Sequence, residues 1–204
     1  MSGNLFVMWV GEDKFVFAPD PASPLTFQNA TRKIRPGIMY TDGGSIPKIA
    51  QPLGGFSPWG YAPAYMIHDW IFVGHHCVVD GKNDGRFNDV KDVEFHESAT
   101  ILAEVIKTLI ESKQVPRHDL AFSAISNSVD SFVARNLWDK QGACETIDPK
   151  HLAAVHAHFG TTPGTRKSLF SAPLELVLPD ATRRRIGSVP RAKVVARFSF
   201  GPAR

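Results

Sequence analysis

The chain opens with the apolar stretch Leu5-Phe6-Val7-Met8-Trp9-Val10, a polar turn at residues 11–14, and a second apolar stretch, Phe15-Val16-Phe17. Two short apolar runs joined by a few polar residues predict a β-hairpin. Alternation of apolar and polar residues returns at residues 31–35 and ends at Pro36-Gly37, which predicts one further strand. We therefore expect residues 1–40 to be mostly β-structure.

The apolar spacing becomes helical after residue 60. Apolar residues recur at intervals of three and four over residues 62–73, 89–113 and 117–138, which predicts three helices, the first ending near Gly74. A shorter helix is expected over residues 148–158, because Asp148 suits an N-cap and Pro149 suits the first turn. Apolar stretches at residues 174–178 and 194–200 are expected to return to the N-terminal sheet as edge strands.

Strands followed by a run of helices predict an α+β fold, with a small antiparallel sheet packed on three or four α-helices. The chain has 204 residues, of which 43% are hydrophobic and 21% charged, and this suits one compact core. We expect residues 1–160 to form a catalytic-like α+β domain and residues 161–204 a basic C-terminal extension.

The apolar segments are too short for a membrane protein. None approaches the ~20 residues that span a bilayer, so no integral membrane contact is expected. The N-terminal apolar run has no basic segment before it, which argues against a signal peptide. We therefore expect a soluble, cytoplasmic protein, placed in the host cytoplasm if it is phage-encoded.

The two cysteines, Cys77 and Cys144, are far apart in the sequence and form no CxxC pair. This pattern indicates neither a disulfide framework nor a thiolate zinc site. We expect small buried thiols in a reducing compartment.

The C-terminal extension is strongly basic and contains the run Arg183-Arg184-Arg185. Such a run favours contact with an acidic partner or a phosphate-bearing polymer, including phage or host proteins. The alternative is a solvated terminus, because no aromatic residues are interleaved with the arginines.

Reactive side chains gather in three segments. Asp42 and Ser45 lie beside two glycines that allow a tight turn and hold the carboxylate in place. His68 and Asp69 interrupt an otherwise apolar helix, and their burial is costly unless each is paired or bound to a cation. Asp92 and His96 are four residues apart on the next predicted helix, with Asp89 on the same face.

Packing of these two helices would bring the segments to one point. Asp42, His68, Asp92 and His96 are then candidate ligands of a divalent metal ion. Mixed carboxylate and imidazole ligands suit zinc, manganese or iron better than calcium. The chemistry that follows is metal-assisted hydrolysis, with Asp69 or His96 as the base.

Two other interpretations use the same residues. Ser45 is a candidate nucleophile with His68 as its base and an aspartate as orienter, although the chain has no G-x-S-x-G elbow. Alternatively, His68 and Asp69 lock the loop at residues 41–45 through hydrogen bonds to its backbone, and Asp42 caps a turn. Asp92 then pairs with Arg86 or Lys91. The histidines His151, His156 and His158 are expected at the surface.

Three motifs together resemble a known family. They are Thr41-Asp42-Gly43-Gly44-Ser45-Ile46-Pro47, then His68-Asp69-Trp70, then Asp92 with Phe95. They are similar to motifs of the domain-of-unknown-function family 1353, which is common in bacteriophage and prophage genomes. The resemblance covers residues 5–110, and Val90-Lys91 stand where the family has arginine and alanine.

The resemblance implies a clustered site in a bacteriophage or prophage protein but names no substrate. Together with the residue chemistry, it leads us to expect a metal-dependent hydrolase acting on a phage-relevant or envelope polymer or ester, with His68, Asp69 and Ser45 as candidate catalytic residues. The alternative is a non-enzymatic phage protein that binds host or virion components.

Overall fold

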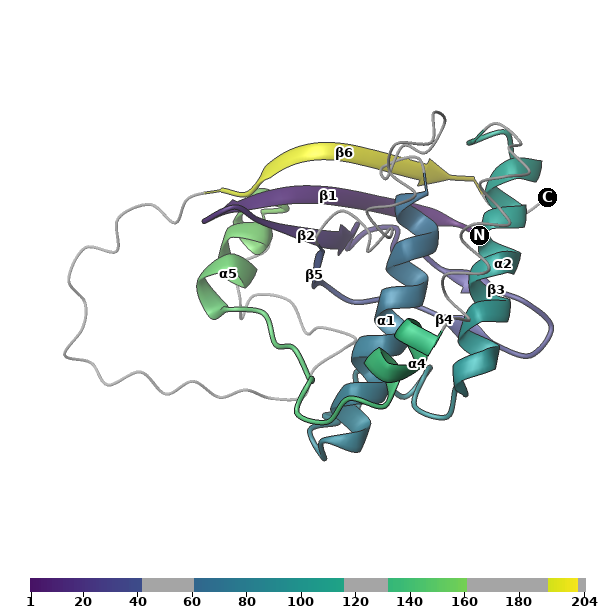
Figure 1. The fold of residues 1–204 in the computed structure, drawn as a ribbon. Coiled ribbons are helices and arrows are strands. Elements are labelled where there is room, and N and C mark those ends of the chain that lie inside the picture. The colour runs from purple at the N-terminus through teal and green to yellow at the C-terminus, as the bar shows by residue number, and fades with distance from the viewer. Residues whose placement is uncertain (42–60, 116–131, 161–190, 202–204) are drawn as a thin grey trace.

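The computed structural model describes residues 1–41, 61–115, 132–160 and 191–201. These residues form an α+β fold with a four-stranded antiparallel sheet and helices packed on it, as predicted (Figure 1). In chain order the elements are β1 (Gly3–Gly11), β2 (Lys14–Pro19), β3 (Phe27–Gln28), β4 (Lys33–Ile34), β5 (Met39–Thr41), α1 (Ala62–Val79), α2 (Phe95–Glu111), α4 (Phe132–Trp138), α5 (Pro149–His158) and β6 (Lys193–Phe200).

The predicted N-terminal hairpin is confirmed. β1 and β2 pair antiparallel, with Val7 opposite Phe17. The turn between them places Glu12 and Asp13 at positive φ angles of 52° and 53°. Two successive left-handed residues are the geometry that matches the twist of a two-residue hairpin.

The main sheet has the strand order β5-β2-β1-β6. β6 pairs antiparallel with β1, so the edge strand expected at residues 194–200 is confirmed, and this part of the predicted extension belongs to the sheet. The strand expected at residues 31–35 is shorter. It forms β4, which pairs with β3 in a separate two-stranded sheet. Residues 174–178 lie outside the described residues.

The two long helices differ from prediction mainly at one end each. α1 continues past Gly74 to Val79, because this glycine provides close packing instead of a helix end. A Cβ atom at Gly74 would lie 2.6 Å from Cγ2 of Val90. α2 begins only at Phe95, so the expected shared helical face of Asp89, Asp92 and His96 is wrong.

The shorter helices agree with prediction where the structure describes them. α5 begins at Pro149, and Asp148 caps it by accepting a hydrogen bond from the Lys150 amide at 2.8 Å. α4 ends at Trp138, the predicted end of the helix over residues 117–138, of which residues 117–131 lie outside the described part of the chain.

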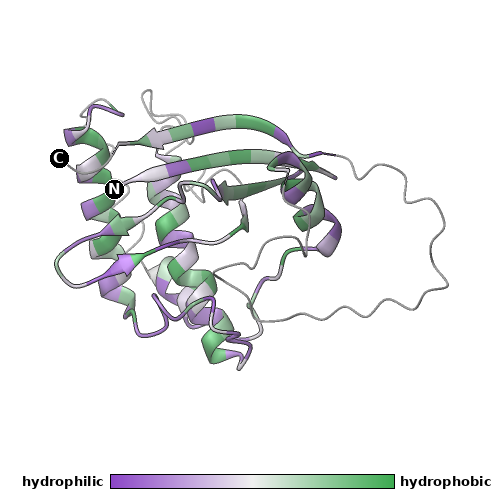
Figure 2. Ribbon diagram, turned by 180° about the vertical axis from the view of Figure 1, so that it is seen from behind, coloured by the Kyte–Doolittle hydropathy of each residue, from purple (hydrophilic) through white to green (hydrophobic). Residues whose placement is uncertain are grey.

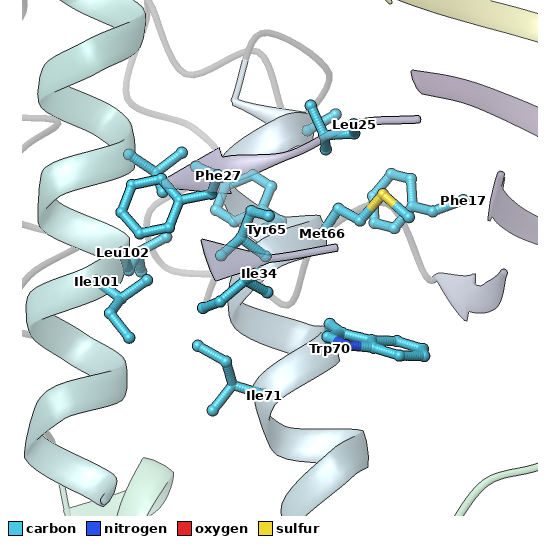
Figure 3. Packing of buried hydrophobic residues seen from close by; sticks show 14 of the residues in the cluster. Phe17, Leu25, Phe27, Ile34, Tyr65, Met66, Trp70, Ile71, Ile101 and Leu102 are labelled. Atoms are coloured by element: carbon cyan, nitrogen blue, oxygen red, sulfur yellow. The ribbon is translucent and has the colours of Figure 1, made fainter. Parts of the chain in front are cut away.

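Strands β1 and β2 have buried residues on both faces of the sheet. Alternate residues such as Leu5, Val7 and Phe17 face α1 and α2, while Met8 and Val16 face α5. Figure 2 shows hydrophobic residues along the strands, and alternating hydrophobic and hydrophilic bands along α2. In Figure 3, Met66 of α1 points toward Phe17 of β2, and Ile101 and Leu102 lie on the side of α2 that faces α1.

A disulfide joins Cys77 of α1 to Cys144, so the expectation of two free thiols is wrong in this structure. Asp80, at the end of α1, supports the same connection by accepting hydrogen bonds from the Gly142 amide at 2.8 Å and the Cys144 amide at 2.9 Å. Disulfides persist in oxidising compartments, so this bond weighs against the reducing compartment that we predicted.

Candidate functional site

α1 carries the polar residues that stand out in the core. It is buried along most of its length, with Ile67, Trp70 and Ile71 at 3% exposure or less. His68 and Asp69 sit between these apolar positions, with side-chain exposures of 12% and 31%. The packing of their apolar neighbours therefore holds both polar side chains at the edge of the core.

The two nitrogens of His68 have different surroundings. Nδ1 lies 3.8 Å from an Asp69 carboxylate oxygen, which is an ion-pair distance and too long for a hydrogen bond. The ring packs against Phe72, with 4.7 Å between ring centroids. Nε2 is buried and has no hydrogen-bonding partner in the described part of the chain. Buried polar atoms are rarely left in this state.

Tyr65 carries a second buried polar atom, and the sequence did not predict it. Its hydroxyl is buried without a hydrogen-bonding partner among the described residues. Burial raises the pKa of this hydroxyl, and Tyr61 and Asp69 add to the rise. An aromatic residue at helical spacing looks like ordinary core, so the only sequence signal was its position three residues before His68. We call Tyr65, His68 and Asp69 the His68 group.

Asp92 belongs to a different polar cluster. Its side chain is 69% exposed and accepts a hydrogen bond from Arg32 at 2.9 Å. Arg32 also binds the carboxylate of Glu97. The pairing expected with Arg86 or Lys91 is replaced by this one, and Arg86 instead pairs with Asp84 at 2.7 Å. Arg32 lowers the pKa of Asp92.

The remaining predicted residues do not gather at His68 in the described structure. His96 is exposed on the first turn of α2. Asp89 accepts a hydrogen bond from the Arg35 amide at 2.7 Å, and burial raises the pKa of its carboxyl. Asp42 and Ser45 lie outside the described residues. Within the described ranges, no three His, Cys, Asp or Glu side chains are grouped closely enough to hold a metal ion.

A buried histidine, His151, lies on the opposite side of the sheet. His151 was expected at the surface, yet only 7% of its side chain is exposed. Its Nδ1 is 2.7 Å from the Tyr40 hydroxyl, and its Nε2 is 3.9 Å from a Glu12 oxygen. Lys150 pairs with the same carboxylate at 2.6 Å and lowers the pKa of Glu12. We call Glu12, Tyr40 and His151 the His151 group.

The other two histidines of this region are less buried than His151. His158 is exposed, as expected, and His156 is partly buried, which lowers the pKa of its imidazole.

Comparison with known proteins gives no match for this chain. The chain matches no protein-family model, no curated protein and no solved structure. The resemblance to the phage-associated family therefore stays a prediction. Among the described residues, no helix combines the length and apolar character needed to cross a membrane.

Proposed function

We propose that this chain is a metal-dependent hydrolase of bacteriophage or prophage origin, with its centre at His68 and Asp69 of α1. The observation that carries the proposal is the buried Nε2 of His68, which lacks a hydrogen-bonding partner in the described part of the chain. A ligand or ion that satisfied this nitrogen would offset the cost of burying it.

The arrangement suits a metal-binding histidine. Such histidines present one ring nitrogen to the ion and the other to a carboxylate or carbonyl, which sets their tautomer and orientation. His68 faces Asp69 with Nδ1 and has Nε2 available. We propose Nε2 of His68 and the carboxylate of Asp42 as ligands of a zinc or manganese ion.

The bound ion and Asp69 would have different roles in hydrolysis. A divalent ion held there would lower the pKa of its bound water toward neutrality. Asp69 is 31% exposed and adjacent to His68, so it is placed to accept the proton of a water molecule. Asp92 is not part of this proposed centre, since it pairs with Arg32. His96 is not part of it either, since it is exposed on the first turn of α2.

Elemental analysis of protein purified without chelator tests the metal site. We expect bound zinc or manganese in the wild type and its loss in His68→Ala and Asp42→Ala. Asp92→Ala is the matched control, because it removes a carboxylate from a different cluster and should keep the ion.

Hydrolysis of p-nitrophenyl acetate and bis(p-nitrophenyl) phosphate tests the activity. The proposal expects EDTA to abolish hydrolysis of at least one probe and added zinc or manganese to restore it. Metal-independent hydrolysis that requires Ser45 would favour the serine mechanism. A metal-free protein that is inactive on both probes would contradict the proposal.

A further inference from the structure

Tyr65 is the most deeply buried polar residue of the His68 group. Only 7% of the residue is exposed, and it lies within the main hydrophobic cluster (Figure 3). Its hydroxyl has no hydrogen-bonding partner in the described part of the chain. A phenylalanine would fill the same space without burying an unsatisfied hydroxyl, so packing does not explain the oxygen atom.

The position of Tyr65 connects it to the candidate centre. It precedes His68 by three residues and Asp69 by four, the spacings at which side chains on one helix are neighbours. The Asp69 charge also contributes to the raised pKa of the Tyr65 hydroxyl, after burial and Tyr61. The phenol therefore keeps its proton at neutral pH and remains a hydrogen-bond donor.

We propose that the Tyr65 hydroxyl donates a hydrogen bond to a negatively charged oxygen of the ligand bound at His68. For its chemistry, this inference rests on the proposed hydrolase function. Hydrolysis of a carboxylate or phosphate ester places negative charge on a carbonyl or phosphoryl oxygen. A donor fixed in advance and shielded from water stabilises that charge strongly.

The geometry also sets a condition on binding. Both the Tyr65 hydroxyl and Nε2 of His68 are covered in this structure. A ligand oxygen can reach them only after the atoms that cover them have moved, so association should be slower than diffusion alone would allow.

Calorimetric titration of the full chain with inorganic phosphate and with acetate tests the donor directly. We expect the wild type to bind at least one anion and Tyr65→Phe to bind it roughly tenfold to a hundredfold more weakly. The anion that binds more tightly indicates which class of ester the site takes. Tyr40→Phe is the matched control, since its hydroxyl is bonded to His151 on the other face of the sheet. Equal affinity in Tyr65→Phe and wild type, or no binding by the wild type, would overturn the inference.

Turnover of the two nitrophenyl probes separates this inference from the proposed function. If Tyr65 acts as described, Tyr65→Phe lowers kcat about 100-fold and leaves KM nearly unchanged. Anion binding that depends on Tyr65, without hydrolysis of either probe, supports the donor and refutes the hydrolase. Hydrolysis that is unchanged in Tyr65→Phe supports the hydrolase and refutes the donor.

Discussion

Tyrosine, histidine and carboxylate side chains come together twice in this chain, around His151 and around His68. In the His151 group, the Tyr40 oxygen accepts from the Asp148 amide at 3.0 Å and lies 2.7 Å from Nδ1 of His151. The Tyr40 hydroxyl therefore bonds both to the Asp148 amide and to the imidazole of His151. In the His68 group, the corresponding phenol and the imidazole Nε2 are buried without partners among the described residues.

The two groups contribute differently to the protein. Polar groups that satisfy one another stabilise the fold, and the His151 group ties α5 to the sheet. A buried polar atom without a partner costs stability, and a ligand that supplies the missing bond recovers that cost. The same residue types thus form a structural link in one place and a candidate binding site in the other.

The largest expected effect comes from a change that leaves both groups intact. The disulfide joins cysteines 67 residues apart. Removal of a cross-link that closes a loop of this size should lower the free energy of unfolding by about 4 kcal/mol. Urea denaturation of the Cys77→Ser/Cys144→Ser double variant measures this. The variant should still bind the same anion as the wild type. Unchanged stability would mean that the disulfide does not form in the folded protein.

Removal of the Tyr40 hydroxyl should break the satisfied group. Tyr40→Phe leaves the buried Nδ1 of His151 and the amide of Asp148 without their partner. We expect the free energy of unfolding to fall by about 2 kcal/mol, the cost of leaving such groups unsatisfied. Denaturant titration monitored by circular dichroism measures the change. A neutral substitution would show that water replaces the hydroxyl without loss.

Arg32→Gln tests whether Asp92 is structural. Arg32 lowers the pKa of Asp92 and Glu97 in the folded chain. A carboxyl whose folded pKa is lowered adds stability above its unfolded pKa and loses it as pH falls through the folded pKa. The variant should therefore be about 1 kcal/mol less stable at neutral pH, and the difference should vanish near pH 2. Urea titrations across this range measure it, and a deficit that persists in acid would assign Arg32 another role.

Local signals in the sequence predicted the elements whose causes are local. The hairpin of β1 and β2 follows from alternating apolar residues around a polar turn, and α5 follows from Asp148 and Pro149 at its start. The positions of His68 and Asp69 on the apolar helix α1 were predicted from local spacing in the same way, and their role stays a prediction.

Contacts between distant parts of the chain were not predictable in this way. Arg32 and Asp92 are 60 residues apart, and no periodicity indicates that they meet. Gly74 resembles a helix end until Val90 is seen packed against it. Tyr65 was missed because the sequence shows an aromatic residue at a core position and does not show that its hydroxyl lacks a partner.

The substitution Tyr65→Phe, with an effect similar in size to that of Arg32→Gln, tests the comparison most directly. Tyr65→Phe removes a buried hydroxyl without a partner in the described chain, so it should raise the free energy of unfolding by roughly 1 kcal/mol. Measured beside Tyr40→Phe by urea denaturation without added anion, the two substitutions should shift stability in opposite directions. If Tyr65→Phe destabilises the protein as Tyr40→Phe does, the Tyr65 hydroxyl is a structural group and the account of the His68 group is contradicted.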